Sequence, residues 1–324
     1  MTKSQKKILS YLIKATVVVL AGIFIYKKLS DNLNLKNFLQ IIHELDTVKV
    51  WLVVGVVFLL MLINWFLESL KWQYLMLKVE KITVTKAIES VFCGLTWAIF
   101  TPNRIGEYGG RIFFLSPRKR IQGMVAMSVG SISQMVITNV FGSLALLWFI
   151  YSFIPLSPLI YFSIVILVFF FIIFFILFYF NIHWLERLLN SIKYLKRFKK
   201  YFSVLNRYHK KELSRIMLYS LSRFLVFTSQ YLLIIHLLVP DVVLYETALM
   251  VFILFFIQSA LPSLDLLDIG IRSLTATYFF AFITPQEIAV MASVALIWFV
   301  NLIIPAMLGS IFVFKLNFFG SKSR

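Results

Sequence analysis

Long apolar runs separated by short charged stretches follow one another along the whole chain. A helix needs about 20 apolar residues to cross the ~30 Å hydrocarbon core of a bilayer. The runs predict six full spans, at about residues 8–26, 50–67, 121–151, 157–181, 214–237 and 287–315. The clearest of them, Leu156 to Phe180, carries no charge. The pattern therefore predicts an all-α polytopic membrane protein.

Two further apolar regions, at about 86–117 and 243–284, are interrupted by a proline and a short polar stretch. The first interruption holds Pro102 and Gly106, and the second holds Pro262 and Gly270. Proline removes a helical hydrogen bond, and glycine permits turns. Each region is therefore predicted to be a re-entrant or broken hairpin. Two full crossings in each region would leave the outer orientation unchanged.

The two interruptions occupy corresponding places in the two halves of the chain. Pro102 and Pro262 are 262 − 102 = 160 residues apart, about half of the 324 residues. The order span, span, hairpin, span occurs at about 8–151 and again at about 157–315, within a single transmembrane domain covering 1–324. Broken segments at matching positions of two halves indicate a transport site near the bilayer midplane.

Basic residues predict how the chain is oriented, because Lys and Arg are concentrated in cytoplasmic loops. They are dense at both ends, after the second span and in the segment 182–213. The markers are Lys3, Lys6, Lys7, Lys71, Lys78, Lys81, Lys86, Lys193, Lys196, Arg197, Lys199, Lys200, Lys315, Lys322 and Arg324. Both termini are therefore expected in the cytoplasm, and the two halves are expected to have opposite orientations, as an inverted-topology repeat.

The segment 182–213 alternates apolar residues with basic ones, which is typical of an amphipathic helix on a membrane surface. A plain basic loop that follows the positive-inside bias is the alternative. The net charge of +18 does not indicate nucleic acid as a partner, because the basic residues lie beside predicted spans.

Composition narrows the chemistry further. Hydrophobic residues make up 60% of the chain and charged residues 14%, where soluble domains have roughly 25% charged. This leaves no room for a soluble catalytic module. The one cysteine, Cys93, cannot form an internal disulfide, and the four histidines lack metal-ligand spacing. No P-loop sequence occurs, so no nucleotide-binding site is predicted. Because neither a metal-ligand spacing nor a nucleotide motif is present in the sequence, neither a metal nor a cofactor is expected.

The polar stretch of the first hairpin holds three candidate substrate-binding residues, Arg104, Glu107 and Arg111. Ionisable groups at bilayer depth persist when they are paired, hydrated or functional. Glu107 and Arg111 are four residues apart and could pair on one helical face. A helix starting near Gly106 would direct amide hydrogens at a phosphate or carboxylate. The alternative is a cytoplasmic loop with solvated charges.

The second hairpin offers Asp265, Asp268 and Arg272 in the same setting and with the same alternative. Asp268 and Arg272 are again four residues apart. Arg223 lies about ten residues inside the span 214–237, where it could be functional, pair with Glu246 or reach the headgroups.

Three stretches carry a resemblance to a known family. They are Pro102-x-Arg104-x-Gly106-Glu107-x3-Arg111, the segment Leu67-ESLKWQYLM and the segment Leu261-PSLDLLDIGIR. Together they resemble the flippase-like family that includes the transmembrane region of lysylphosphatidylglycerol synthases, and length and span number match nearly end to end. Two stretches depart from that pattern. In the second signature Leu266, Leu267 and Asp268 precede Gly270 where paired glycines are usual, and Ser273 stands near an expected acid. In the span 121–151, Ser133-Gln134 stands where a Glu-Arg pair is common.

The resemblance implies movement of a lipid or lipid-like amphiphile, such as an aminoacylated phospholipid, between the leaflets of a bacterial-type plasma (inner) membrane. The expected partners are membrane lipids with anionic or zwitterionic headgroups, and a homo-oligomer is possible in principle. Arg104, Arg111 and Arg272 would hold a lipid phosphate, while Glu107, Asp265 and Asp268 would balance charge or hold an ammonium group.

The chain is not expected to be an enzyme, because it lacks the soluble aminoacyl-transfer domain of the synthases and shows no nucleophile–base pair. Two alternatives stay open. One is a membrane enzyme acting on a lipid-linked substrate, with Glu107 or an Asp of the second hairpin as general base. The other is a membrane partner subunit of a separate lipid-modifying enzyme, docked through 182–213.

Overall fold

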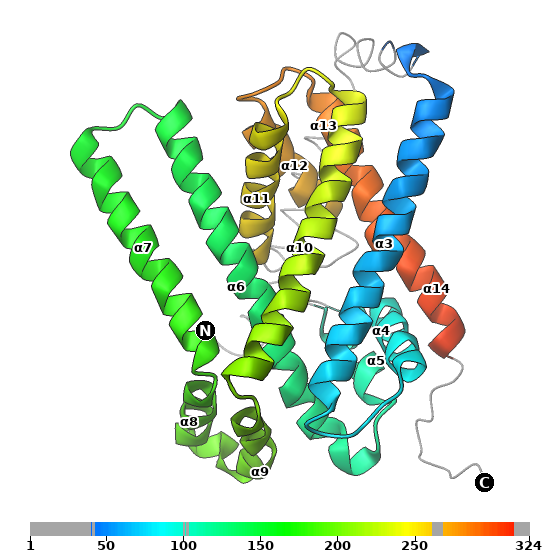
Figure 1. Cartoon of the computed structure of the whole chain (residues 1–324), viewed down its shortest axis with the longest axis vertical. Helices are drawn as coiled ribbons and strands as arrows, with labels where there is room; N and C mark the ends of the chain where they lie inside the picture. The colour runs from blue at the N-terminus through cyan, green and yellow to red at the C-terminus, as the bar shows by residue number, and fades with distance from the viewer. Residues whose placement is uncertain (1–39, 41–42, 100, 102–103, 261–267, 314–324) are drawn as a thin grey trace, which may run out of the picture.

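A computed structural model of the chain describes residues 40, 43–99, 101, 104–260 and 268–313. All regular structure in these ranges is helical, which confirms the predicted all-α membrane fold (Figure 1). The predicted span at 8–26 lies outside the described residues, as do Pro102, Pro262 and Asp265.

Five helices of the described part are long and apolar enough to cross a membrane. They correspond to five of the six predicted spans. The first four are α3 (Thr47–Met76), α6 (Arg120–Phe153), α7 (Pro158–Phe180) and α10 (Lys210–Leu238). The fifth is continuous through α13 (Glu287–Trp298), the π-helical segment η5 (Phe299–Ile303) and α14 (Ile304–Val313). The total number of spans stays a prediction.

The helix α3 continues beyond the predicted end of its span at Leu67 and finishes at Met76. Lys71 was expected in a cytoplasmic loop, and this is wrong: it lies in α3 and is 2% exposed. Charge normally ends an apolar run, but a buried charge is tolerated where an opposite charge contacts it. Glu68, one turn earlier, supplies that contact to Lys71.

Helices end at both predicted interruptions. The first region consists of α4 (Val84–Ile99) and α5 (Ile105–Ile112), followed by the short η2 (Pro117–Lys119), and the second consists of α11 (Leu244–Ala260) and α12 (Asp268–Phe280). Each helix is shorter than the ~20 residues of a full crossing. Figure 1 shows α4 and α5 in the lower half of the molecule and α11 and α12 in the upper half. An inverted repeat is compatible with this placement and stays a prediction.

Close backbone approach holds the first hairpin together. A Cβ atom added at Gly110 would lie 2.5 Å from the Cα of Gly94, across the α4–α5 contact. A Cβ at Gly309 would lie 2.0 Å from the carbonyl oxygen of Phe92, across the contact between α14 and α4. Small residues at helix contacts permit this distance in membranes. The hairpin is therefore fixed between α14 and the rest of the bundle.

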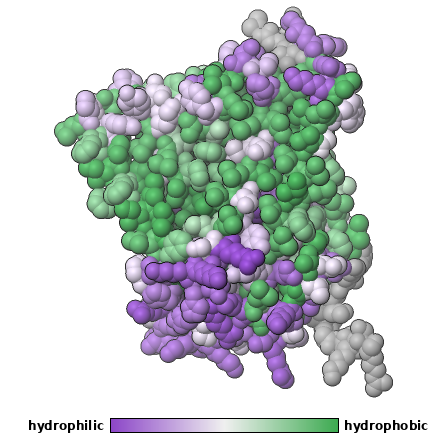
Figure 2. Space-filling model, in the orientation of Figure 1, coloured by the Kyte–Doolittle hydropathy of each residue, from purple (hydrophilic) through white to green (hydrophobic). Residues whose placement is uncertain are grey.

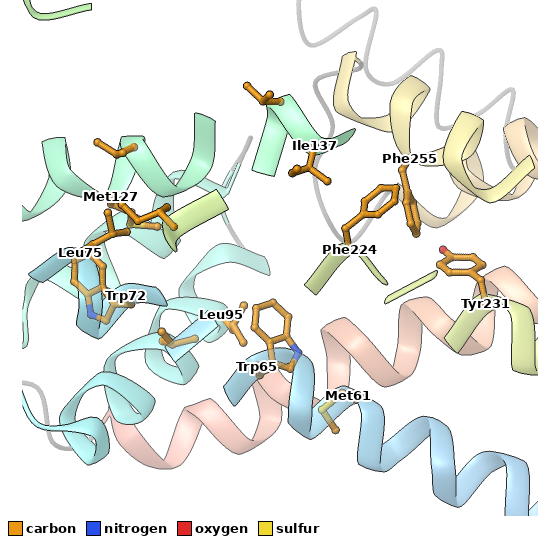
Figure 3. Close-up of a cluster of buried hydrophobic side chains, with 14 of the residues drawn as sticks. Met61, Trp65, Trp72, Leu75, Leu95, Met127, Ile137, Phe224, Tyr231 and Phe255 are labelled. Carbon is orange, nitrogen blue, oxygen red and sulfur yellow. The ribbon is translucent and has the colours of Figure 1, made fainter. Parts of the chain in front are cut away.

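Large buried side chains connect the two halves of the bundle (Figure 3). Trp65 and Trp72 on α3 are 4% and 0% exposed. Phe224 and Tyr231 of α10 pack on Phe255 of α11, with ring centroids 5.6 and 5.4 Å apart. Such aromatic contacts stabilise helix packing without hydrogen bonds. The core therefore surrounds the polar site described below.

The segment 182–213 does not form the single amphipathic helix that its pattern suggested. It is divided into α8 (His183–Ser191), η3 (Lys193–Phe198), α9 (Lys199–Phe202) and η4 (Ser203–Arg207) before α10 begins. Figure 2 shows this end of the molecule as hydrophilic, below a wide hydrophobic band. The Tyr208 hydroxyl donates to the Leu75 carbonyl at 2.7 Å, and burial raises the pKa of Tyr208. This bond joins the segment to the end of α3.

Candidate functional site

A cluster of charged side chains lies inside the helix bundle, where α3, α5 and α10 meet. We call Glu68, Lys71, Arg104, Glu107, Arg111 and Arg223 the charge cluster. Glu68 is its centre: one carboxylate oxygen lies 2.7 Å from Arg111 Nη1, and the other lies 2.8 Å from Lys71 Nζ and also contacts Arg223. A carboxylate with three cationic partners is fixed in place by all of them.

Glu107 is the second carboxylate of the cluster. It forms an ion pair with Arg111, which confirms the pairing predicted from their spacing, and lies 3.1 Å from Arg104 Nε. Arg111 thus bridges Glu107 and Glu68, and its side chain is only 1% exposed. The side chain of Arg104 is 39% exposed. Arg104 can therefore meet a ligand with far less rearrangement than Arg111 can.

Arg223 reaches the cluster from α10. Its Nε donates to the Asn64 side-chain oxygen at 2.9 Å, and its Nη1 contacts Glu68. Arg223 therefore neither pairs with Glu246 nor extends to the headgroups, and both of these expectations were wrong. Its guanidinium carbon also lies 5.2 Å from the centre of the Trp65 ring, where a cation–π attraction acts.

The helix break places Arg104 at the start of α5 in a left-handed conformation, with φ of 56°. Among the described non-glycine residues it is the one with a positive φ. Such a conformation is uncommon and persists where the surroundings enforce it. The Gly106 amide donates to the Thr101 hydroxyl at 2.7 Å, so it is already bonded across the break. The expected free amide at Gly106 is therefore not available to a ligand.

Two adjoining cavities lie beside the charge cluster. The lower one, of about 410 Å³, is lined by all six members of the cluster. The upper one, of about 330 Å³, extends to α11, α12 and η5 and includes Arg272 in its lining. Both are lined by Trp65, Arg104, Gln134, Thr138, Arg223 and Ser259. These shared residues show that the two cavities adjoin inside the bundle.

Positive charge predominates within the charge cluster. The charge cluster contains four cations and two carboxylates, a formal excess of two positive charges among its members. A further arginine, Arg272, lines the upper cavity. Arginine presents a planar fork of donors that suits phosphate and carboxylate groups. The arrangement can therefore accept an anionic group.

The structure brings together only some of the predicted site residues. Arg104, Glu107 and Arg111 share the charge cluster, and Arg272 lines the adjoining cavity. Asp268 begins α12, but its side chain lies outside what the structure describes. Gly106 is the second residue of α5, so the predicted break lies directly before it. Gly270 is the third residue of α12, and residues 261–267, directly before this helix, lie outside the described part.

Sequence reasoning missed Glu68, Lys71 and Asn64. Hydropathy ended the span at Leu67, so the next charges were assigned to a loop. A spacing of three between Glu68 and Lys71 is a helical pair and would have extended the helix. An acid at the margin of an apolar run is the signal that could have identified the centre of the cluster.

Comparison with known proteins identifies the family. Residues 11–309 match the family model described as the lysylphosphatidylglycerol synthase transmembrane region. This family includes enzymes, so the expectation that the chain is not an enzyme is corrected. No curated protein matches the chain. Because the matched region covers most of the sequence, the multi-pass membrane protein described above belongs to the family of the lysylphosphatidylglycerol synthase transmembrane region.

Proposed function

We propose that the protein binds the phosphate of an anionic or zwitterionic membrane lipid in the cavity and moves the headgroup between leaflets. The observation that carries this proposal is the excess of cations over carboxylates in the charge cluster, which lies beside two adjoining cavities inside an apolar bundle. A phosphate is the lipid group that arginine recognises best. The acyl chains would stay in the hydrocarbon while the headgroup passes through the two cavities.

The contacts within the cluster assign different roles to its arginines. Arg111 is bonded to both Glu68 and Glu107, so we assign it to holding α5 in place. Arg104, Arg223 and Arg272 line the upper cavity and are assigned to the phosphate. The sequence predicted Arg104, Arg111 and Arg272 as the phosphate-binding residues. In the present proposal Arg223 takes the place of Arg111. Glu68 keeps Arg223 in position, which lowers the ordering cost of binding.

The wider arrangement that we propose is an inverted repeat in a plasma membrane, with both termini in the cytoplasm. In proteins of that design, two broken hairpins face one site and alternate in opening it. The position of α4 and α5 at one end and of α11 and α12 at the other supports this (Figure 1). Asp265 and Asp268 of the second hairpin would balance the charge of a bound headgroup.

The test is transfer of headgroup-labelled phosphatidylglycerol in proteoliposomes. Wild-type protein is expected to expose the label faster than empty vesicles do, and Arg104→Gln is expected to slow this by about tenfold, through loss of one charged hydrogen bond. Arg118→Gln is the matched control, since Arg118 is exposed and lies in η2. Equal rates in wild-type, Arg104→Gln and empty vesicles would refute the proposal. If mass spectrometry of the same lipids detected new products, the protein would be an enzyme instead.

A further inference from the structure

Lys71 is a buried lysine of the lower cavity to which the proposed function assigns no role. Its side chain is 3% exposed, and among the described residues it forms one ion pair, with Glu68 at 2.8 Å. The lysine stem lies against α6, because a Cβ atom added at Gly130 would be 3.5 Å from Lys71 Cε. The glycine therefore leaves room for a lysine whose amine lies beside Glu68 and whose side chain lines the cavity.

Lys71 differs from the other three cations of the charge cluster in one chemical property. Arginine keeps its proton in proteins, whereas the lysine amine exists in both a charged and a neutral form. The arginines of the cluster therefore carry a constant charge. Among the four cations, Lys71 is the one that can change the charge of the cluster by exchanging a proton with water, and the cavity beside it offers the route.

The charged and titratable groups described in the lining of the lower cavity come from α3, α10, and α5 with its N-cap residue. Besides Lys71, they are Glu68, Arg104, Glu107, Tyr108, Arg111 and Arg223. The helix α6, which also packs on α3, contributes only uncharged side chains to this lining, and α4 contributes none. The charge state of Lys71 is therefore governed by this set and by any anion that enters the cavity.

Two cations contact the same oxygen of Glu68. Lys71 Nζ lies 2.8 Å from Oε2, and Arg223 contacts that atom as well, while Arg111 contacts Oε1. Loss of the Lys71 proton would thus leave Glu68 with two arginine partners. When a phosphate engages Arg223, the ammonium group of Lys71 can replace Arg223 as the partner of Oε2. Binding of a phosphate and uptake of a proton are linked in this way.

We propose that Lys71 takes up one proton when the headgroup phosphate enters the cavity and releases it when the phosphate leaves, so that headgroup and proton cross together. The proposal rests on the proposed function and specifies what drives it. The neutral amine of Lys71 forms an N–H bond with a proton from water on one side, and that bond breaks when the proton returns to water on the other side. A pH difference would then move headgroups toward the more alkaline side.

The test measures how headgroup-labelled phosphatidylglycerol distributes between the two leaflets of phosphatidylcholine proteoliposomes, with and without a pH difference of one unit. One pH unit corresponds to about a factor of ten for one proton. Wild-type protein is expected to give up to about a tenfold excess of label in the leaflet that faces the alkaline side. Collapsing the pH difference is expected to abolish this excess.

Two substitutions remove the exchangeable proton in opposite ways. Lys71→Arg keeps the positive charge permanently, and Lys71→Gln removes it permanently. Both are expected to abolish the excess of label that the pH difference produces. Lys78→Arg is the matched control and should keep it, because Lys78 pairs with Glu212 in a partly exposed position outside both cavities. If one variant of Lys71 fails to fold, the other still decides the question.

The outcomes separate the coupling from the transfer itself. Transfer by wild-type protein without any excess on the alkaline side would overturn the coupling and leave the proposed function standing. A wild-type response to pH in either variant of Lys71 would overturn the assignment of the proton to Lys71. Absence of transfer by wild-type protein, with or without a pH difference, would refute the proposed function together with the coupling.

Discussion

The charge cluster and the surface segment 182–213 use the same types of basic side chain in opposite ways. In the cluster, the side chains of Lys71 and Arg111 are 3% and 1% exposed and contact Glu68. In the segment, Lys193, Lys196 and Lys200 are exposed to the surroundings. Buried charges depend on their partners, whereas exposed charges interact mainly with water and headgroups. Position, and not residue type, therefore decides which basic residues are indispensable.

The largest expected effect comes from removing the centre of the cluster. Glu68→Gln leaves Lys71 and Arg223 without their carboxylate, and Glu107 remains the only acid of the cluster. Removing one partner of a buried ion pair typically costs about 3–5 kcal/mol of unfolding free energy. Thermal unfolding in detergent measures the loss. Glu212→Gln is the control, because its pair with Lys78 is partly exposed and is worth about 0–1 kcal/mol. Equal losses of unfolding free energy in Glu68→Gln and Glu212→Gln would contradict the distinction between buried and exposed ion pairs.

The next effect tests whether backbone packing holds the cluster in place. Gly110→Ala would bring a methyl group within 2.5 Å of the Gly94 Cα, and backbone atoms cannot give way cheaply. Overpacking of this kind costs about 1–3 kcal/mol. A Cβ at the neighbouring Gly109 meets nothing within 4 Å, so Gly109→Ala is expected to be neutral or slightly stabilising. Thermal unfolding of the two variants measures the difference. An unchanged unfolding temperature for Gly110→Ala would show that the α4–α5 contact is loose.

A smaller effect is expected where charge is kept and geometry is lost. Arg223→Lys retains a cation near Glu68 but cannot also reproduce the Nε donation to Asn64 and the planar contact with Trp65. The expected loss is about 1–2 kcal/mol. Arg197→Lys, on the exposed segment, should change stability by at most about 0.5 kcal/mol. Similar values for the two variants would mean that Arg223 acts as a point charge.

The smallest effect is expected in the segment itself. Neutralising Lys193, Lys196 and Lys200 together to Gln should leave thermal unfolding in detergent almost unchanged, since surface substitutions contribute about 0.5 kcal/mol or less each. In nanodiscs the same variant should lose part of the stabilisation that anionic lipids give over neutral ones, because each Lys near such a surface is worth about 1 kcal/mol. A large loss in detergent would place these lysines in the folded core.

The sequence predicted what periodicity and composition determine, and missed what only packing determines. Apolar runs located α3, α6, α7 and α10, and the predicted interruptions fall between α4 and α5 and between α11 and α12. The pairing of Glu107 with Arg111 followed from their spacing. Glu68 was missed because two of its three partners, Arg111 and Arg223, come from helices distant in sequence, and a hydropathy scale gives a paired charge the same value as a solvated one. Arg223 could not be assigned for the same reason.

The central claim is that Arg104 and Arg223, which line both cavities, receive a lipid phosphate. It is tested most directly by an experimental density map of the protein in nanodiscs that contain phosphatidylglycerol. A lipid phosphate is expected within hydrogen-bond distance of Arg104 and Arg223, with the headgroup in the upper cavity. A map that shows ordered lipids only around the outer surface, with the cavity holding water alone, would contradict it.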